Sequence, residues 1–384
     1  MGSSNSHRII NNLLALAALV LIAVLLSWVA VHWDLDRKLS GVFYSPDNGW
    51  HLKNRIPWKW LYQYGEIPGL LLAFSALGTW FIVAGKPRKR QLRRACLVIF
   101  LATVIGPGLI VNGVLKNYWG RPRPRHVDTF GGNWEYRHVY QPGIPQKGES
   151  FPCGHCSMGF IFCSLLVLRR QYPKLAVTGT AAGVLMGTAL GFARVVQGAH
   201  FPTDVLWSFT VVAGVILLLD TFIPMPDAHA ALRPRRRAGR AGKWLPAVAI
   251  AAAILLTVGF LLHQPFYEDH RLQLVLPPSV RQIVLSTDVH PEKVDVRFTD
   301  NRLPAIVLEA KGFAWPGASH RLVSHVKKPE DGIVEARLTV VKKGYFTELT
   351  HEISIFLPKA LENTIDVKII DPVVPKKYHE GVGE

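Results

Sequence analysis

The chain has 384 residues, of which 49% are hydrophobic, and its formal net charge is +17. A mean hydropathy of +0.20 is high for a soluble protein, so membrane-crossing segments are expected. The basic residues lie in short segments beside long apolar runs, as membrane insertion requires, and this placement argues against nucleic acid as the partner.

Seven apolar stretches are long enough, or nearly so, to cross a hydrocarbon core of about 30 Å. They are 9–31, 67–85, 95–115, 154–168, 175–193, 205–223 and 244–262. The fourth stretch is shorter than the others and contains Gly and Ser. The first is too long for a signal peptide, and no clear cleavage site follows it. The sequence therefore predicts an all-α polytopic membrane helical bundle of six or seven spans.

Clusters of Lys and Arg follow the second, fourth and sixth stretches, at 86–94, 169–174 and 233–243. Because Lys and Arg remain on the cytoplasmic side of a membrane, we expect these clusters and Arg8 on that side. The segments after the first, third and fifth stretches, together with the C-terminal tail, then lie on the outer side.

The first of these outer segments is rich in aromatic residues interleaved with Lys and Arg. Aromatic side chains of this kind anchor a protein at the level of the lipid headgroups, and gripping a substrate headgroup is the alternative role. The aromatic residues are Trp50, Trp58, Trp60 and Tyr62.

The character of the sequence changes near residue 264. Alternating apolar runs separated by Pro, Gly, Asp and Asn predict short β-strands, for example Val294–Phe298, Ala336–Val341 and Glu352–Phe356. The chain then divides into a first span with its aromatic loop (1–66), a helical core (67–223), a basic loop with the last span (224–263) and a soluble, β-sandwich-like domain on the outer side (264–384).

Three outer segments bring ionisable residues to the membrane boundary. Together they carry three cations, two histidines and one carboxylate, namely Lys116, Arg123, His155, Arg194, His200 and Asp204. Arg supplies paired planar donors and Lys a point charge, and both bind phosphate oxygens strongly. A helix that begins at Gly154 would add free backbone N–H groups. This combination of residues indicates a site for a phosphate ester.

The spacing of His200 and Asp204 suits nucleophilic catalysis. If a helix begins here, with Pro202 in its first turn, positions i and i+4 share one face. Asp204 then accepts a hydrogen bond from one imidazole nitrogen and leaves the other free to attack phosphorus. His155 is the candidate general acid for the leaving alkoxide. Lys116, Arg123 and Arg194 would stabilise the charge that develops on the phosphoryl oxygens.

Three segments resemble the signature motifs of the type 2 phosphatidic acid phosphatase superfamily. They are KNYWGRPRP (116–124), FPCGHCSMGF (151–160) and ARVVQGAHFPTD (193–204). The family pattern is Lys, six residues, Arg-Pro; then Pro-Ser-Gly-His; then Ser-Arg, five residues, His, three residues, Asp. The resemblance covers about residues 60–223. It implies a helical-bundle core, a phosphohistidine intermediate and neither a metal nor another cofactor.

Carried over residue by residue, the resemblance implies the same roles for the six ionisable residues, and it places Cys153 and Gly154 at the phosphate. Two positions depart from the family pattern, because Cys153 replaces Ser and Ala193 stands where Ser often precedes the Arg. A thiol is a weak hydrogen-bond donor, so Cys153 is expected to weaken phosphate binding or to change the substrate preference. Arg121 and Arg125, which flank the first motif, would either grip a second phosphate or a headgroup, or be solvated loop charges.

The expected function is hydrolysis of a lipid phosphate or diphosphate, at the periplasmic leaflet of a bacterial inner membrane. The partners are the membrane and an anionic phospholipid or another lipid phosphate. Candidate substrates are lipid A, undecaprenyl diphosphate, phosphatidylglycerophosphate and phosphatidic acid. The alternative closest in mechanism is transfer of the phosphoryl group to another lipid through the same intermediate.

Two other classes of function compete with the phosphatase. Cys153 and Cys156 form a Cys-x-x-Cys tetrad, which is typical of thiol–disulfide oxidoreductases, but no thioredoxin-like βαβ pattern surrounds it. The same thiols could instead pair and gate a phosphatase. A membrane anchor that displays the β domain and carries an inactive core is the third class.

Overall fold

The structure is a computed structural model that describes residues 2–46, 48–132, 134–143, 145, 148–226, 264–287, 294–299, 303–314, 318–327, 332–343 and 346–370. The chain forms two compact units, Met1–Leu262 and His263–Glu384.

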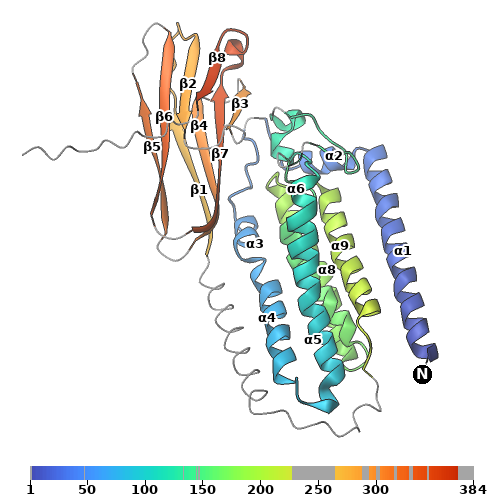
Figure 1. Ribbon diagram of the computed structural model, residues 1–384. Coiled ribbons are helices and arrows are strands. Elements are labelled where there is room, and N and C mark those ends of the chain that lie inside the picture. The colour runs from blue at the N-terminus through green and yellow to red at the C-terminus, as the bar shows by residue number, and fades with distance from the viewer. Residues whose placement is uncertain are drawn as a thin grey trace, which may run out of the picture. The chain divides into compact units, whose positions relative to one another are not determined.

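The first unit is a bundle of helices (Figure 1). Its main helices are α1 (Gly2–His32), α4 (Ile67–Ile82), α5 (Arg90–Thr103), α7 (Gly154–Phe160), α8 (Pro173–Val196) and α9 (Pro202–Phe222). Shorter elements at the helix ends are α2 (Leu35–Gly41), α3 (Trp58–Tyr64) and α6 (Lys116–Tyr118). Two further helical segments extend α5 and α7, namely η2 (Val104–Leu115) and η5 (Ile161–Leu168).

Five helical segments of the described residues are long and apolar enough to cross a membrane. They are Ser6–His32, Trp58–Ile82, Pro87–Tyr118, Pro173–Val196 and Pro202–Phe222. The shorter apolar helix Gly154–Leu168 coincides with the short predicted stretch. The predicted stretch 244–262 lies outside the described residues, so the number of spans stays a prediction. The prediction of a multi-pass helical membrane protein is confirmed.

Small residues let α7 and α8 approach each other closely. A Cβ atom added to Gly159 of α7 would lie 2.6 Å from the Cα of Gly187 in α8, so neither helix can carry a side chain at this crossing. Glycine contacts of this kind are a common means of packing membrane helices. The close crossing fixes α7, whose first turn carries His155, against α8, whose last turn carries Arg194.

At one end of the bundle, the side chain and the backbone carbonyl of Asp220 in α9 bind basic side chains from three other parts of the chain. Arg94 Nη1 lies 2.8 Å from Asp220 Oδ1 and Arg169 Nη2 lies 3.2 Å from Oδ2. Arg8 donates to the backbone carbonyl of Asp220, and Asn12 donates to Oδ2. Arg8, Arg94 and Arg169 belong to the sets that the charge bias assigned to one side of the membrane, and they do meet at one end of the bundle.

The second unit contains two four-stranded sheets, with strand orders β1-β4-β7-β3 and β5-β6-β2-β8. The strands are β1 (Gln264–Gln273), β2 (Gln282–Thr287), β3 (Val294–Phe298), β4 (Ala305–Ala314), β5 (Ser319–Val326), β6 (Ile333–Lys343), β7 (Phe346–Leu357) and β8 (Asp366–Ile370). Buried residues of both sheets, such as Leu285 of β2 and Ile355 of β7, share one apolar core. The three strands predicted from alternation fall on β3, β6 and β7, so the β character of this region is confirmed.

Candidate active site

The three predicted motifs meet at the end of the bundle opposite to Asp220. Lys116 begins α6, His155 lies in the first turn of α7, and Arg194 lies in the last turn of α8. His200 follows α8 and Asp204 lies in the first turn of α9, which begins at Pro202 as expected. Burial, together with the charges of Arg194, Lys116, His200 and Arg123, lowers the pKa of His155 well below its ordinary value, so these groups lie close to its imidazole. The cations that the sequence predicted to surround a phosphate are therefore gathered and not scattered.

His200 is held by the backbone of the preceding motif. Its Nδ1 lies 2.5 Å from the carbonyl oxygen of Ser150, and the side chain of His200 is buried. A carbonyl oxygen only accepts hydrogen bonds, so Nδ1 carries the proton and donates it to Ser150. In the neutral form of this ring, the second nitrogen, Nε2, therefore holds the lone pair for nucleophilic attack.

Asp204 lies one helical turn from His200, as its spacing predicted, but it is not the nearest acceptor. Its Oδ2 lies 3.8 Å from His200 Nδ1 and accepts hydrogen bonds from the Ser150 hydroxyl at 2.6 Å and from the Phe201 amide at 2.8 Å. Asp204 therefore positions His200 largely through Ser150, which the sequence analysis did not include in the site.

Arg121 is fully buried and joins two carboxylates. Its Nη1 lies 2.5 Å from Asp204 Oδ1, and its Nη2 lies 2.7 Å from Asp36 Oδ2. Asp36 also accepts hydrogen bonds from the amide and the hydroxyl of Thr203. Burial lowers the pKa of Arg121, but the charges of Asp204 and Asp36 outweigh burial and raise it above its ordinary value. Arg121 is thus neither a grip for a second phosphate nor a solvated loop charge, and the prediction for this residue was wrong.

The general-acid candidate, His155, has two neighbours that the sequence analysis missed. Its Nδ1 lies 3.3 Å from Glu66 Oε1, and its ring stacks on Tyr62 with centroids 4.9 Å apart. The guanidinium of Arg194 lies over the same Tyr62 ring, 4.4 Å from its centroid. Tyr62 belongs to the aromatic outer segment, so at least this residue does more than anchor the protein among headgroups. A carboxylate next to one imidazole nitrogen orients the ring.

The other two guanidinium groups of the motifs have side-chain partners near the surface of the site. Arg123 Nη2 lies 2.7 Å from Glu149 Oε2, and the Glu149 side chain is 41% exposed. Arg194 Nη1 donates to Gln197 Oε1 at 2.5 Å, whereas its buried Nε has no hydrogen-bond partner among the described residues. A buried donor without a partner is costly, so Arg194 is prepared to bind an additional acceptor.

The segment before α7 is held rigidly. The Cys153 carbonyl accepts hydrogen bonds from the Ser208 hydroxyl at 2.6 Å and from the Cys156 thiol at 3.3 Å. A Cβ atom at Gly154 would lie 2.5 Å from Asn112 Oδ1, so only glycine fits beside this side chain. Burial raises the pKa of the Cys153 thiol, but hydrogen bonding with Cys156 and the charge of His200 outweigh burial and bring the pKa well below its usual value.

Residues 92–225 match a family model described as the PAP2 superfamily, which is the type 2 phosphatidic acid phosphatase superfamily. This region of the chain belongs to the superfamily. The three motifs all lie within the PAP2 match, whereas Asp36, Tyr62 and Glu66 precede it. The β unit lies outside it as well.

Several curated proteins are similar to part of the chain. A lipid A 4'-phosphatase of Francisella tularensis subsp. novicida is 35% identical over 159 residues, which are 40% of this chain and 66% of the relative. A lipid A 4'-phosphatase of Rhizobium leguminosarum is 35% identical over 130 residues, 33% of this chain and 54% of the relative. A lipid A 1-phosphatase of Rhizobium johnstonii is 34% identical over 106 residues, 27% of this chain and 38% of the relative. The chain thus spans just under two thirds of the first relative's length and less of the others. No solved structure matches the chain.

Proposed function

We propose that the chain is a membrane phosphatase that removes a phosphate group from a lipid, at the periplasmic leaflet of a bacterial inner membrane. The observation that carries the proposal is the hydrogen bond from His200 Nδ1 to the Ser150 carbonyl, because it assigns the lone pair of the neutral imidazole to Nε2, the atom that attacks. The gathering of Lys116, Arg123 and Arg194 supports it, as do the names of the relatives. Lipid A is therefore the first substrate to test.

In the proposed reaction, Nε2 of His200 attacks phosphorus and the lipid alkoxide leaves with a proton from His155. Lys116, Arg123, Arg194 and the Gly154 backbone amide stabilise the phosphoryl oxygens during this step. Water then attacks the phosphohistidine, and His155 accepts the proton of that water. Asp204 acts as a positioning residue through Ser150 and the start of α9. These roles require no metal ion or other cofactor.

The decisive experiment offers the purified protein a panel of lipid phosphates and measures the release of inorganic phosphate. The panel contains lipid A, phosphatidic acid, phosphatidylglycerophosphate and undecaprenyl diphosphate, with His200→Ala as the inactive control. Separation of the lipid products distinguishes hydrolysis from transfer to a second lipid. Release from none of these lipids would overturn the proposal.

The alternative of a thiol–disulfide oxidoreductase gains no support from the site. Cys153 and Cys156 are both fully buried, and both are free thiols. A thiol–disulfide exchange reaction requires a thiolate that the disulfide bond of a substrate can reach.

If Cys153 and Cys156 instead regulate the phosphatase by forming a disulfide, treatment with a reductant will change the rate of phosphate release. An unchanged rate removes that hypothesis.

Replacing Cys153 with serine should lower KM for the lipid phosphate several-fold, with a larger gain at higher pH. A hydroxyl is a better hydrogen-bond donor than a thiol. Because the pKa of Cys153 lies well below its usual value, the thiolate forms as pH rises and repels the phosphate, whereas serine stays neutral. The measurement is the ratio of the two KM values across the pH range in which the protein is stable. A ratio that does not change with pH would contradict the role of the thiolate.

A further inference from the structure

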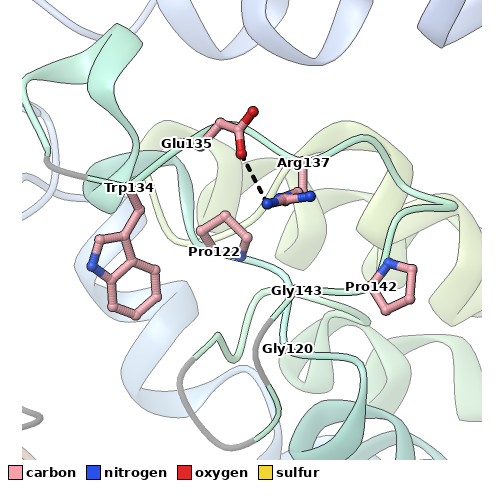
Figure 2. A pocket seen from close by; sticks show the side chains of 7 residues that line it. All are labelled: Gly120, Pro122, Trp134, Glu135, Arg137, Pro142 and Gly143. Carbon is pink, nitrogen blue, oxygen red and sulfur yellow. Dashed lines mark ion pairs between the residues drawn. The ribbon is translucent and has the colours of Figure 1, made fainter.

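A pocket of about 370 Å³ lies in the loop region that connects α6 to α7 (Figure 2). Its lining residues are Gly120, Pro122, Trp134, Glu135, Arg137, Pro142 and Gly143. None of the residues proposed to hold phosphate or to catalyse the reaction lines this pocket. Two of its lining residues, Gly120 and Pro122, nevertheless flank Arg121, and Arg123 follows Pro122 directly. The pocket is therefore separate from the phosphate site but adjacent to it along the chain.

The walls of the pocket combine an aromatic ring with exposed polar groups. Trp134 is fixed through its backbone, which donates to the His126 carbonyl and accepts from the Asp128 amide. Glu135 and Arg137 form an ion pair at 2.8 Å, and their side chains are 74% and 44% exposed. Figure 2 shows this pair above Pro122, with Trp134 on one side and Pro142 on the other. An exposed ion pair contributes little to stability, so these groups are available for a ligand.

These chemical groups suit a sugar ring better than an acyl chain or an isolated phosphate. The face of a sugar ring carries C–H groups that pack on an indole, while its hydroxyl groups both donate and accept hydrogen bonds. Glu135 supplies acceptors and Arg137 supplies planar donors. An acyl chain would leave both charged groups without hydrogen bonds from the ligand, and a bare phosphate would be repelled by Glu135. A few polar groups on an otherwise apolar concave surface are typical of small-ligand sites.

Two glycines allow the backbone segments of the pocket wall to approach each other closely. A Cβ atom at Gly143 would collide with the Gly120 carbonyl oxygen. The Gly143 amide donates to the Trp119 carbonyl at 2.9 Å, and this hydrogen bond holds the two segments of the loop against each other. Two backbone segments can approach this closely only when a side chain is missing. The shape of the pocket therefore depends on these glycines.

Arg121 connects the pocket with the catalytic end of the bundle. Its Nε donates to the Arg137 carbonyl at 3.0 Å, while its Nη1 binds Asp204. Arg137 thus contributes its side chain to the pocket and its backbone to the network that positions His200. A ligand in the pocket is consequently held in a defined position relative to the nucleophile.

We propose that this pocket binds the sugar ring of a phosphorylated glycolipid while a phosphate group of the same molecule reaches Arg123 and His200. The proposal rests on the proposed function and names the headgroup class that the phosphatase prefers. The indole of Trp134 stacks on the ring, and the Glu135–Arg137 pair binds its hydroxyl groups. Lipids whose phosphate is attached to glycerol or to a polyprenol leave the pocket empty.

The test measures kcat/KM for three substrates, which are lipid A, phosphatidic acid and the small ester p-nitrophenyl phosphate. Replacing Trp134 with alanine should reduce kcat/KM for lipid A about 10-fold, a loss of about 1.4 kcal/mol of binding energy. Values for the other two substrates should change less than about 2-fold, because those substrates make no contact with the indole. Arg137→Gln should show the same selectivity, whereas Trp134→Phe should retain most of the lipid A activity.

Trp28→Ala, which removes an indole that is exposed on α1, is the matched control and should leave all three values unchanged. Activity on p-nitrophenyl phosphate reports that each variant is folded. Equal losses on lipid A and phosphatidic acid, or no loss on lipid A, would overturn the sugar subsite while the proposed function stands. A wild-type protein that releases phosphate from no lipid would instead refute the proposed function.

Discussion

Replacement of His200 by alanine should lower the rate of phosphate release about 10⁴-fold or more, with both lipid substrates and small phosphate esters. The reason is that the phosphoryl group has no other acceptor in the proposed reaction, and removal of a covalent nucleophile typically has effects of this size. The KM should change much less, because Lys116, Arg123 and Arg194 remain to hold the phosphate. Steady-state rates together with a search for a phosphorylated histidine in the stopped reaction check this expectation.

The variant His155→Ala distinguishes the role of His155 as general acid from the role of His200 as nucleophile. A general acid matters most when the leaving group is basic, so this variant should lose activity on a lipid alkoxide and much less on p-nitrophenyl phosphate. His51→Ala, at an exposed position of the outer segment, controls for the loss of an imidazole as such.

A His200→Ala variant that keeps a tenth of the wild-type activity would refute the nucleophilic role of His200.

Replacement of Arg121 by methionine should destabilise the protein by about 3–5 kcal/mol, because it leaves two buried carboxylates without their cation. The side chains of Arg121, Asp36 and Asp204 are 0%, 2% and 0% exposed, so water cannot take the place of the guanidinium. Activity should fall as well, since Asp204 would no longer be held beside Ser150. The measurements are the midpoint of thermal inactivation and the rate of phosphate release.

The triple variant Arg121→Met, Asp36→Asn, Asp204→Asn removes all three charges and should recover much of the lost stability without recovering activity. Arg88→Met, at an exposed position before α5, is the matched control and should behave as wild type. If Arg121→Met were as stable as Arg88→Met, the buried network would not contribute in the way that its geometry indicates.

Local spacing in the sequence predicted the parts of the site that local structure determines. The starts of α7 at Gly154 and of α9 at Pro202 agree with expectation. His200 and Asp204 are neighbours because residues i and i+4 share a helical face. The long apolar stretches that fall within the described residues are likewise helices, since a segment in lipid must satisfy its own backbone groups.

Contacts between distant parts of the chain were not predictable in this way. Asp36 and Arg121 are 85 residues apart in sequence, and no periodicity connects them. Ser150 was missed because its backbone carbonyl, which any residue type would supply, accepts the bond from His200. Tyr62 and Glu66 were overlooked for a different reason. An aromatic residue at a membrane boundary has an ordinary explanation, and only the packing of α3 and α4 near α7 reveals the stack on His155.

The pairing of Asp36 with Arg121 has a consequence for the shortest fragment that can be active. The match to the superfamily model begins at residue 92. One of the two carboxylates that neutralise Arg121 nevertheless comes from α2, and the tyrosine ring that stacks on His155 comes from α3. A fragment trimmed to the similar region would therefore carry every motif residue and still fail as an enzyme.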